Sequence, residues 1–97
     1  MEPPDVLGVV GAGVMGAGIA QLASLAGMQT LLYDSSPEAL EAAVVRIARD
    51  LDRGAERGSW TPVQAVRAQA KLSPVSAAAD LAPAQLVVEA VPEDLDL

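Results

Sequence analysis

Three glycines near the start of the chain have the spacing of a phosphate-binding turn. Gly11, Gly13 and Gly16 give the pattern G-x-G-x-x-G between a hydrophobic run, Val6–Val10, and a run of small residues typical of a helix. In such a turn the first glycine allows the sharp bend, the second leaves space for a phosphate group beside the backbone, and the third lets the helix pack closely on the strand. The free N–H groups at the start of the helix then face the phosphate.

An acid at the end of the next hydrophobic run indicates which molecule carries that phosphate. Asp34 follows the run Thr30–Tyr33 and stands 18 residues beyond Gly16, close to the place of a ribose-binding carboxylate in a strand–helix–strand unit. A carboxylate there accepts hydrogen bonds from both ribose hydroxyls and repels a 2′-phosphate. Ser35 and Ser36 come next, and neither binds a 2′-phosphate as an arginine would. The residues therefore predict a dinucleotide site for NAD rather than NADP.

Simpler interpretations of the same residues exist. The glycines also fit a glycine-rich turn in an ordinary α/β protein, and Asp34 also fits an acid that only caps a helix. The order of strand, glycine turn, helix, strand and terminal acid favours the dinucleotide site over both.

The composition limits the remaining chemistry. The 97 residues are 52% hydrophobic but only 2% aromatic, so the core of one small domain must consist mainly of Ala, Val and Leu. A net charge of −7 argues against nucleic acid as a partner. The chain has no cysteine and no histidine, which removes disulfides, thiolate metal sites and the commonest general base. We therefore expect no metal site and no catalytic residue within the chain.

The segment Val6–Tyr33 carries no charge and is long enough to be considered as a membrane span. Glycines and the polar residues Gln21, Ser24 and Gln29 interrupt it, and it divides into strand, helix and strand. The residues before it, Met1–Asp5, are acidic, whereas a signal peptide begins with basic residues. The expectation is a soluble, cytoplasmic protein without a membrane partner.

The chain alternates between strand and helix patterns. Ser36-Pro37-Glu38 has the cap hydroxyl, the proline and the acid of a helix start, and Thr61-Pro62-Val63-Gln64 has a capping box. These two helices end near Gly58 and Ala70, so they form a helical hairpin between two strands, and Trp60 is expected to anchor its turn. The predicted strands are Asp5–Val10, Gln29–Tyr33, Lys71–Ser76 and a buried Gln85–Ala90, and the first helix is Val14–Ala26.

The hairpin has an apolar and a basic side. The apolar residues at helical spacing are Leu40, Val44, Ile47 and Leu51 on its first helix, and Val63, Val66 and Ala70 on its second. The arginines on the opposite face of the first helix are Arg46, Arg49, Arg53 and Arg57. They form either a solvated surface or a row of cations for a phosphorylated ligand, and the sequence favours neither.

These elements predict a Rossmann-type fold, which is a doubly wound parallel α/β sheet. The four strands correspond to its first half, with strand order 3-2-1-4, and the helical hairpin lies between strands 2 and 3. A new helix start with acids in its first turn, Val91–Leu97, ends the chain. We therefore expect residues 1–97 to be the amino-terminal part of a dinucleotide-binding domain in a longer protein.

Several motifs together resemble the amino-terminal domain of L-3-hydroxyacyl-CoA dehydrogenases. They are Gly8–Gln21 with its additional Met15 and Gly18, the triplet Leu32-Tyr33-Asp34, and Leu86–Leu95 with its V-E-A-x-x-E block. The resemblance covers the whole chain. It implies NAD-dependent oxidation of a 3-hydroxyacyl-CoA to a 3-ketoacyl-CoA in fatty acid β-oxidation, by a homodimer joined through a C-terminal helical domain beyond this chain.

The same resemblance assigns residues to two ligands. For the acyl-CoA substrate it implies the hairpin, with Arg57 at a basic position and Asp50 where relatives often carry a serine. The family's catalytic histidine and its partners are expected beyond Leu97. For NAD it implies Gly11, Ala12, Gly13, Val14, Met15, Gly16, Asp34, Ala90 and Glu93.

Two other functions fit part of the pattern. A regulatory domain that senses NAD without catalysis shares the glycines and the acid, but it usually has a single short helix where this chain has Pro37–Ala70. Related hydroxyacid dehydrogenases share the G-x-G-x-M-G portion and are less similar after Asp34.

Overall fold

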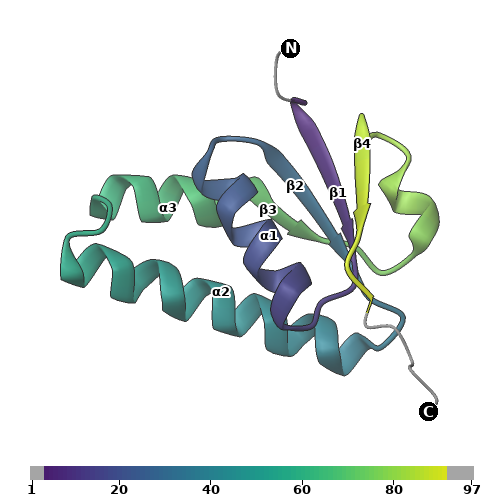
Figure 1. Cartoon of the computed structure of the whole chain (residues 1–97), viewed down its shortest axis with the longest axis horizontal. Helices are drawn as coiled ribbons and strands as arrows, with labels where there is room; N and C mark the ends of the chain where they lie inside the picture. Colours follow the sequence, from purple (N-terminus) through teal and green to yellow (C-terminus); the bar gives the residue numbers. More distant parts are fainter. Residues whose placement is uncertain (1–3, 92–97) are drawn as a thin grey trace.

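The hydrophobic runs predicted as strands pair in one parallel sheet. The computed structural model describes residues 4–91. Its strands are β1 (Val6–Val10), β2 (Gln29–Tyr33), β3 (Leu72–Pro74) and β4 (Leu86–Glu89). They run parallel in the order β3-β2-β1-β4 (Figure 1), which confirms the predicted topology.

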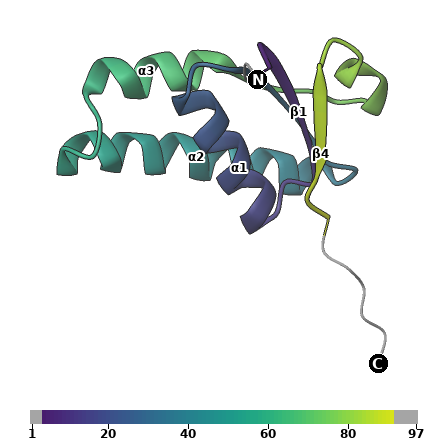
Figure 2. The ribbon, with the colours of Figure 1, turned by 45° about the horizontal axis from the view of Figure 1, so that its top comes forward.

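The α-helices pack together on one face of this sheet. They are α1 (Val14–Leu25), α2 (Pro37–Arg57) and α3 (Pro62–Lys71), and a short 3-10 helix, η1 (Ala78–Leu81), follows β3. α1 joins β1 to β2, and α2 and α3 form the predicted hairpin between β2 and β3. Figure 2 shows the α-helices and η1 on opposite sides of β1 and β4. Within residues 4–91, none of the helices is both long and apolar enough to cross a membrane.

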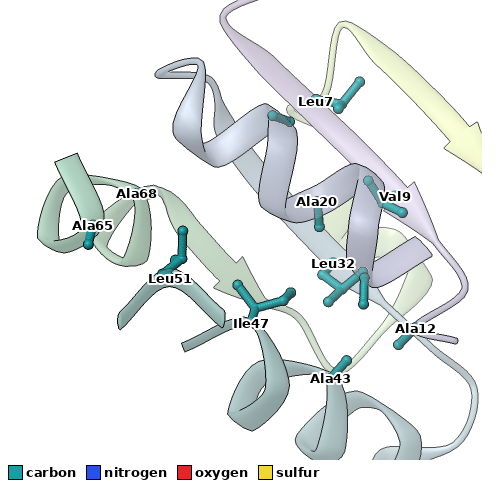
Figure 3. Packing of buried hydrophobic residues seen from close by; sticks show 12 residues of the cluster. Leu7, Val9, Ala12, Ala20, Leu32, Ala43, Ile47, Leu51, Ala65 and Ala68 are labelled. Atoms are coloured by element: carbon teal, nitrogen blue, oxygen red, sulfur yellow. The ribbon is translucent and has the colours of Figure 1, made fainter. Parts of the chain in front are cut away.

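The core lies between the sheet and the α-helices, and small side chains dominate it (Figure 3). Val9 and Leu32 of the sheet and Ile47 and Leu51 of α2 belong to one cluster and are fully buried. Short side chains let the helices approach the sheet and one another closely. The alanines of this cluster are Ala12, Ala17, Ala20, Ala23, Ala43, Ala65 and Ala68.

The predicted apolar face of α2 is only partly correct. Of its four members, Leu40 and Val44 are half-buried, whereas Ala43 and Gly54 are buried although they were not predicted. α2 packs closely against both α1 and α3. Its buried face therefore includes the small residues Ala43 and Gly54, which allow this close approach.

The apolar sides of two other elements face solvent rather than the core. On α3, Val63 and Val66 are exposed, and Ala65 and Ala68 are buried instead, because α3 lies close to α1 and α2. The prediction of a buried β4 is wrong: Leu86 is 52% exposed. Within the described residues β4 forms the edge of the sheet and pairs with β1 alone.

Trp60 anchors the turn of the hairpin to α2. The indole Nε1 donates a hydrogen bond of 2.8 Å to the backbone oxygen of Leu51. The indole ring lies against Gly54, where a Cβ would overlap the ring. Gly58 then ends α2 in the left-handed conformation, with φ +79°, and Thr61 starts α3 with a capping box. The predicted turn is confirmed, and so is the anchoring role of Trp60.

Candidate dinucleotide-binding site

A cleft opens at the point where the strand order of the sheet reverses. β2 and β3 lie on one side of β1, and β4 lies on the other. Ligands of open α/β sheets bind at such a switch point, outside the carboxyl ends of the strands. The cleft has a volume of about 270 Å³ and includes both parts of the predicted site, the glycine turn and Asp34. Its lining residues are Val10, Gly11, Gly13, Tyr33, Asp34, Ser35 and Val91.

Two of the three glycines are required by close packing. Gly11 has φ +106°, and a Cβ there would lie 2.8 Å from the backbone oxygen of Ala90, just after β4. A Cβ at Gly16 would overlap the backbone oxygen of Gly11. The chain folds back so tightly between β1 and α1 that only glycine fits at either position.

Gly13 and the start of α1 leave room for a ligand. A Cβ at Gly13 would meet no atom within 4 Å, so no protein contact requires a glycine here. α1 begins after this residue without a side-chain cap and without an acid in its first turn, whereas Ser36 caps α2 and Thr61 caps α3. The N–H groups of the first turn are therefore available to an anion, and the helix dipole favours one. This arrangement fits the pyrophosphate of a dinucleotide.

The Asp34 carboxylate faces the glycine turn. Its Oδ2 accepts a hydrogen bond of 2.8 Å from the N–H of Ala12, and its Oδ1 accepts one of 2.7 Å from the N–H of Ser36. Ser36, rather than Asp34, is the cap of α2, since its hydroxyl accepts from the N–H of Ala39. A carboxylate offers about four acceptor positions, so Asp34 keeps two for the ribose hydroxyls.

The other residues predicted for NAD differ in what they can present to a ligand. Ala12 and Ala90 are buried, so only their backbone groups could reach a cofactor. Val14 and Met15 project into solvent at the start of α1, with 81% and 69% of their surface exposed. Glu93 lies outside the described residues.

The two residues predicted for coenzyme A lie away from this cleft. Asp50 is half-buried and lines a second cleft, of about 350 Å³, between α1 and α2, together with Gly18 and Arg46. Arg57 is exposed in the last turn of α2. Because a helix rises about 1.5 Å per residue, Arg57 lies roughly 30 Å along α2 from the end beside Asp34. The structure thus places Asp50 in a cleft and Arg57 on the exposed surface of α2.

Two features of the site escaped the sequence predictions. The N–H of Ser36 fixes the Asp34 carboxylate, and the sequence Asp34-Ser35-Ser36 already contained that signal because it is typical of an Asx turn. Gln21 lines the cleft between α1 and α2, and its spacing of three residues from Gly18 would have placed both on one face of the helix.

Comparison with known proteins identifies the family. The family model for the "3-hydroxyacyl-CoA dehydrogenase, NAD binding domain" matches residues 6–97. The chain belongs to this family. The predicted family, the Rossmann-type fold and the cofactor NAD are thereby confirmed. The match also runs through the hairpin, which distinguishes this NAD-binding domain from the sensor domains with a single short helix.

Individual members of the family agree closely with the chain. It is 43% identical over 93 residues to 3-hydroxyadipyl-CoA dehydrogenase of Escherichia coli (strain K12). The aligned residues make up 96% of this chain and 20% of that protein. It is 38% identical over 95 residues to the probable 3-hydroxybutyryl-CoA dehydrogenase of Bacillus subtilis (strain 168), which covers 98% of the chain and 33% of that protein.

Solved structures give the same result. The crystal structure of 3-hydroxybutyryl-CoA dehydrogenase from Escherichia coli K12 superposes with a TM-score of 0.90 at 41% identity, over 98% of this chain and 20% of that one. The (S)-3-hydroxybutyryl-CoA dehydrogenase from Ralstonia eutropha superposes with a TM-score of 0.89 at 32% identity, over 97% and 33%. The chain therefore spans a third or less of the length of these relatives.

Proposed function

We propose that this chain is the amino-terminal, NAD-binding part of an enzyme that oxidises a 3-hydroxyacyl-CoA to the 3-ketoacyl-CoA. NAD, when bound, accepts the hydride that leaves C3 of the substrate, and the hydroxyl proton passes to a base outside residues 1–97, which contain no histidine. The uncapped start of α1 beside the Asp34 carboxylate is the observation that carries the proposal.

In this proposal the chain's own residues bind and orient the cofactor. The N–H groups in the first turn of α1 hold the pyrophosphate, and the space at Gly13 admits it. Asp34 accepts hydrogen bonds from the ribose hydroxyls, and Ala90 forms the wall behind Gly11. The proposed NAD residues are Gly11, Ala12, Gly13, Val14, Met15, Gly16, Asp34, Ala90 and Glu93.

The acyl-CoA substrate is proposed to lie along α2. Arg46 and Asp50 line the cleft between α1 and α2, and Arg53 and Arg57 continue the same side of the helix at spacings of three and four residues. The arginines offer cations to the phosphate groups of coenzyme A. Asp50 is suited to accept a hydrogen bond from a hydroxyl or amide group of the coenzyme.

The proposal extends to the whole protein. In this proposal the whole protein is longer than these 97 residues, acts in fatty acid β-oxidation in the cytoplasm and forms a homodimer through a C-terminal helical domain. A relative in Pseudomonas putida, 34% identical over 86 residues, is named "Fatty acid oxidation complex subunit alpha", which supports the pathway. Mass spectrometry of the native protein should detect peptides that follow Leu97, and size-exclusion chromatography with light scattering should give the mass of a dimer.

Cofactor selectivity provides the first test. Calorimetric titration should show that NAD binds more tightly than NADP, since Asp34 repels the 2′-phosphate. The double variant Asp34→Ala, Ser35→Arg should lose about ten- to a hundredfold in NAD affinity, and its preference for NAD should narrow or reverse. Glu41→Gln, which removes a neighbouring carboxylate, should leave the preference unchanged. Equal binding of NAD and NADP by the wild-type protein would contradict the role of Asp34.

Activity provides the second test. The full-length protein should form NADH from 3-hydroxybutyryl-CoA and NAD, in proportion to the enzyme concentration. Residues 1–97 alone should form none, because they lack a histidine to take up the hydroxyl proton. A full-length protein that binds NAD but turns over no 3-hydroxyacyl-CoA would favour the sensor function instead.

A further inference from the structure

The Asp34 carboxylate holds the glycine turn in addition to facing the ribose position. We propose that Asp34 is a positioning residue: its bond to the N–H of Ala12 fixes the phosphate-binding turn before any nucleotide arrives. The inference deepens the proposed NAD site and rests on it. It predicts that Asp34 contributes to the binding of nucleotides that have no ribose hydroxyls at all.

The bond from Ala12 to the Asp34 side chain continues the row of hydrogen bonds between β1 and β2. The backbone ladder between β1 and β2 continues to Gly11, whose N–H donates to the oxygen of Tyr33 at 2.8 Å. The next N–H, that of Ala12, donates at 2.8 Å to Asp34 Oδ2. Ala12 is only 3% exposed, and Asp34 Oδ2 is the one acceptor that the described residues offer to its N–H. An unpaired N–H at a buried position is costly, which makes the turn dependent on Asp34.

The carboxylate is itself held from its other side. Asp34 Oδ1 accepts from the N–H of Ser36 at 2.7 Å, and the Ser36 hydroxyl accepts from the N–H of Ala39 at 3.2 Å. The start of α2 therefore fixes the orientation of the carboxylate plane. Through Asp34, the glycine turn is connected to the first turn of a 21-residue helix.

Asp34 acts close to the position where the phosphate is expected. Gly11 is held by its packing against Ala90, and Gly16 is held by its packing against Gly11. Gly13 lies between them, and the position of its absent Cβ has no atom within 4 Å. The bond between Ala12 and Asp34 thus fixes the Gly11–Ala12 peptide, one residue before the open position. Loss of this bond should loosen the turn where the pyrophosphate is expected to bind.

The first test needs no variant. In the nucleotide-free wild-type protein, NMR should detect a scalar coupling across the hydrogen bond between the Ala12 amide nitrogen and the Asp34 carboxylate carbon. A second coupling is expected between the Ser36 amide nitrogen and the same carbon. Absence of the Ala12 coupling in a well-resolved spectrum would overturn the proposal, whatever the protein binds.

The second test separates the turn from the ribose. Asp34→Asn keeps the shape of the side chain, but it replaces one of the two acceptor oxygens with an NH₂ donor group. The N–H groups of Ala12 and Ser36 can then no longer each donate to a separate oxygen of this side chain. The ligands are ADP and 2′,3′-dideoxy-ADP, which lacks both ribose hydroxyls. The variant should bind dideoxy-ADP about five- to tenfold more weakly than wild type does.

The matched control is Glu41→Gln, which removes one carboxylate beside the same segment but makes no hydrogen bond to the turn. It should leave the affinity for dideoxy-ADP unchanged. Equal affinity of wild type and Asp34→Asn for dideoxy-ADP would overturn the proposal. If the wild-type protein binds neither nucleotide, the proposed NAD site fails, and the NMR couplings still decide the role of Asp34 in the turn.

Discussion

Gly13 and Gly16 lack a side chain for opposite reasons. At Gly16 a Cβ would overlap the backbone oxygen of Gly11, so the fold itself requires glycine. At Gly13 the space is open, and the backbone angles, φ −73° and ψ −167°, are accessible to any residue. The fold therefore has room for a side chain at Gly13, but such a side chain should exclude the phosphate of the ligand from the space beside the turn.

Substitution of these two glycines should separate stability from binding. Gly13→Val should lower the melting temperature by no more than about 5 °C, because valine is a poorer N-cap than glycine, but it should weaken NAD binding at least about tenfold because the valine would occupy the proposed phosphate position. Gly16→Ala should lower the melting temperature markedly, since backbone must move. Thermal unfolding and calorimetric titration of both variants provide the measurements. Tight NAD binding by Gly13→Val would place the phosphate elsewhere.

The sequence predicted that Asp34 lies beside the glycine turn, but it did not predict the hydrogen bonds that hold the Asp34 carboxylate there. The spacing between Gly16 and Asp34 was sufficient to place an acid beside a glycine turn. The bond between Ala12 and Asp34 could not be predicted, because it depends on how closely the ends of β1 and β2 approach. The bond to Ser36 is local, and the sequence alone would have been enough to expect it.

Among the helices, the hairpin shows what local sequence can specify. The ends of α2 and α3 were predicted because Ser36, Gly58 and Thr61 act on their own neighbouring backbone. The buried faces were not, because burial on α2 and α3 depends on the spacing between packed helices. At Ala65 and Ala68 that spacing admits methyl groups, so the larger Val63 and Val66 face solvent.

Two glycines inside helices should respond to alanine with opposite signs. A Cβ at Gly54 would overlap the Trp60 ring, so Gly54→Ala should lower the free energy of unfolding by about 1–3 kcal/mol. Gly18 on α1 is exposed and has no atom within 4 Å of its Cβ position. Gly18→Ala should therefore raise the free energy of unfolding by up to about 1 kcal/mol, through helix propensity alone. Urea denaturation measures both values, and a stabilised Gly54→Ala would show that Trp60 does not pack as described.

At the scale of the whole molecule, charge is distributed unevenly. The chain carries 13 acidic and 6 basic residues, yet α2 holds four of its arginines, Arg46, Arg49, Arg53 and Arg57. All four are exposed. An acidic protein with a basic helix attracts a phosphorylated ligand to that helix rather than to its surface in general.

Loss of the Arg57 side chain should weaken the binding of the proposed acyl-CoA substrate and leave the binding of the cofactor unchanged. In the full-length protein, Arg57→Ala should raise the KM for acetoacetyl-CoA by about three- to tenfold, near the lower end of a charge-assisted contact because the side chain is exposed. The KM for NADH should stay constant, since the cleft with Asp34 lies at the other end of α2. Arg67→Ala on α3 is the control. An unchanged KM for acetoacetyl-CoA would show that Arg57 is a solvated charge.

The strand order was predictable because parallel strands joined by right-handed crossovers allow few arrangements. The exposure of β4 was not, because the hydrophobic sequence Leu86-Val87-Val88 specifies a strand but does not specify what covers it.

The contact between Trp60 and Gly54 also determines what light can report about this protein. Trp60 is the single tryptophan of the chain, so selectively excited emission arises at the hairpin tip. A fluorescence melting curve therefore follows the packing of the hairpin turn against α2, whereas far-ultraviolet circular dichroism follows all the helices together. Coincident curves would mean that the hairpin and the sheet unfold as one cooperative unit. An earlier fluorescence transition would mean that the hairpin opens while the cleft beside Asp34 is still folded.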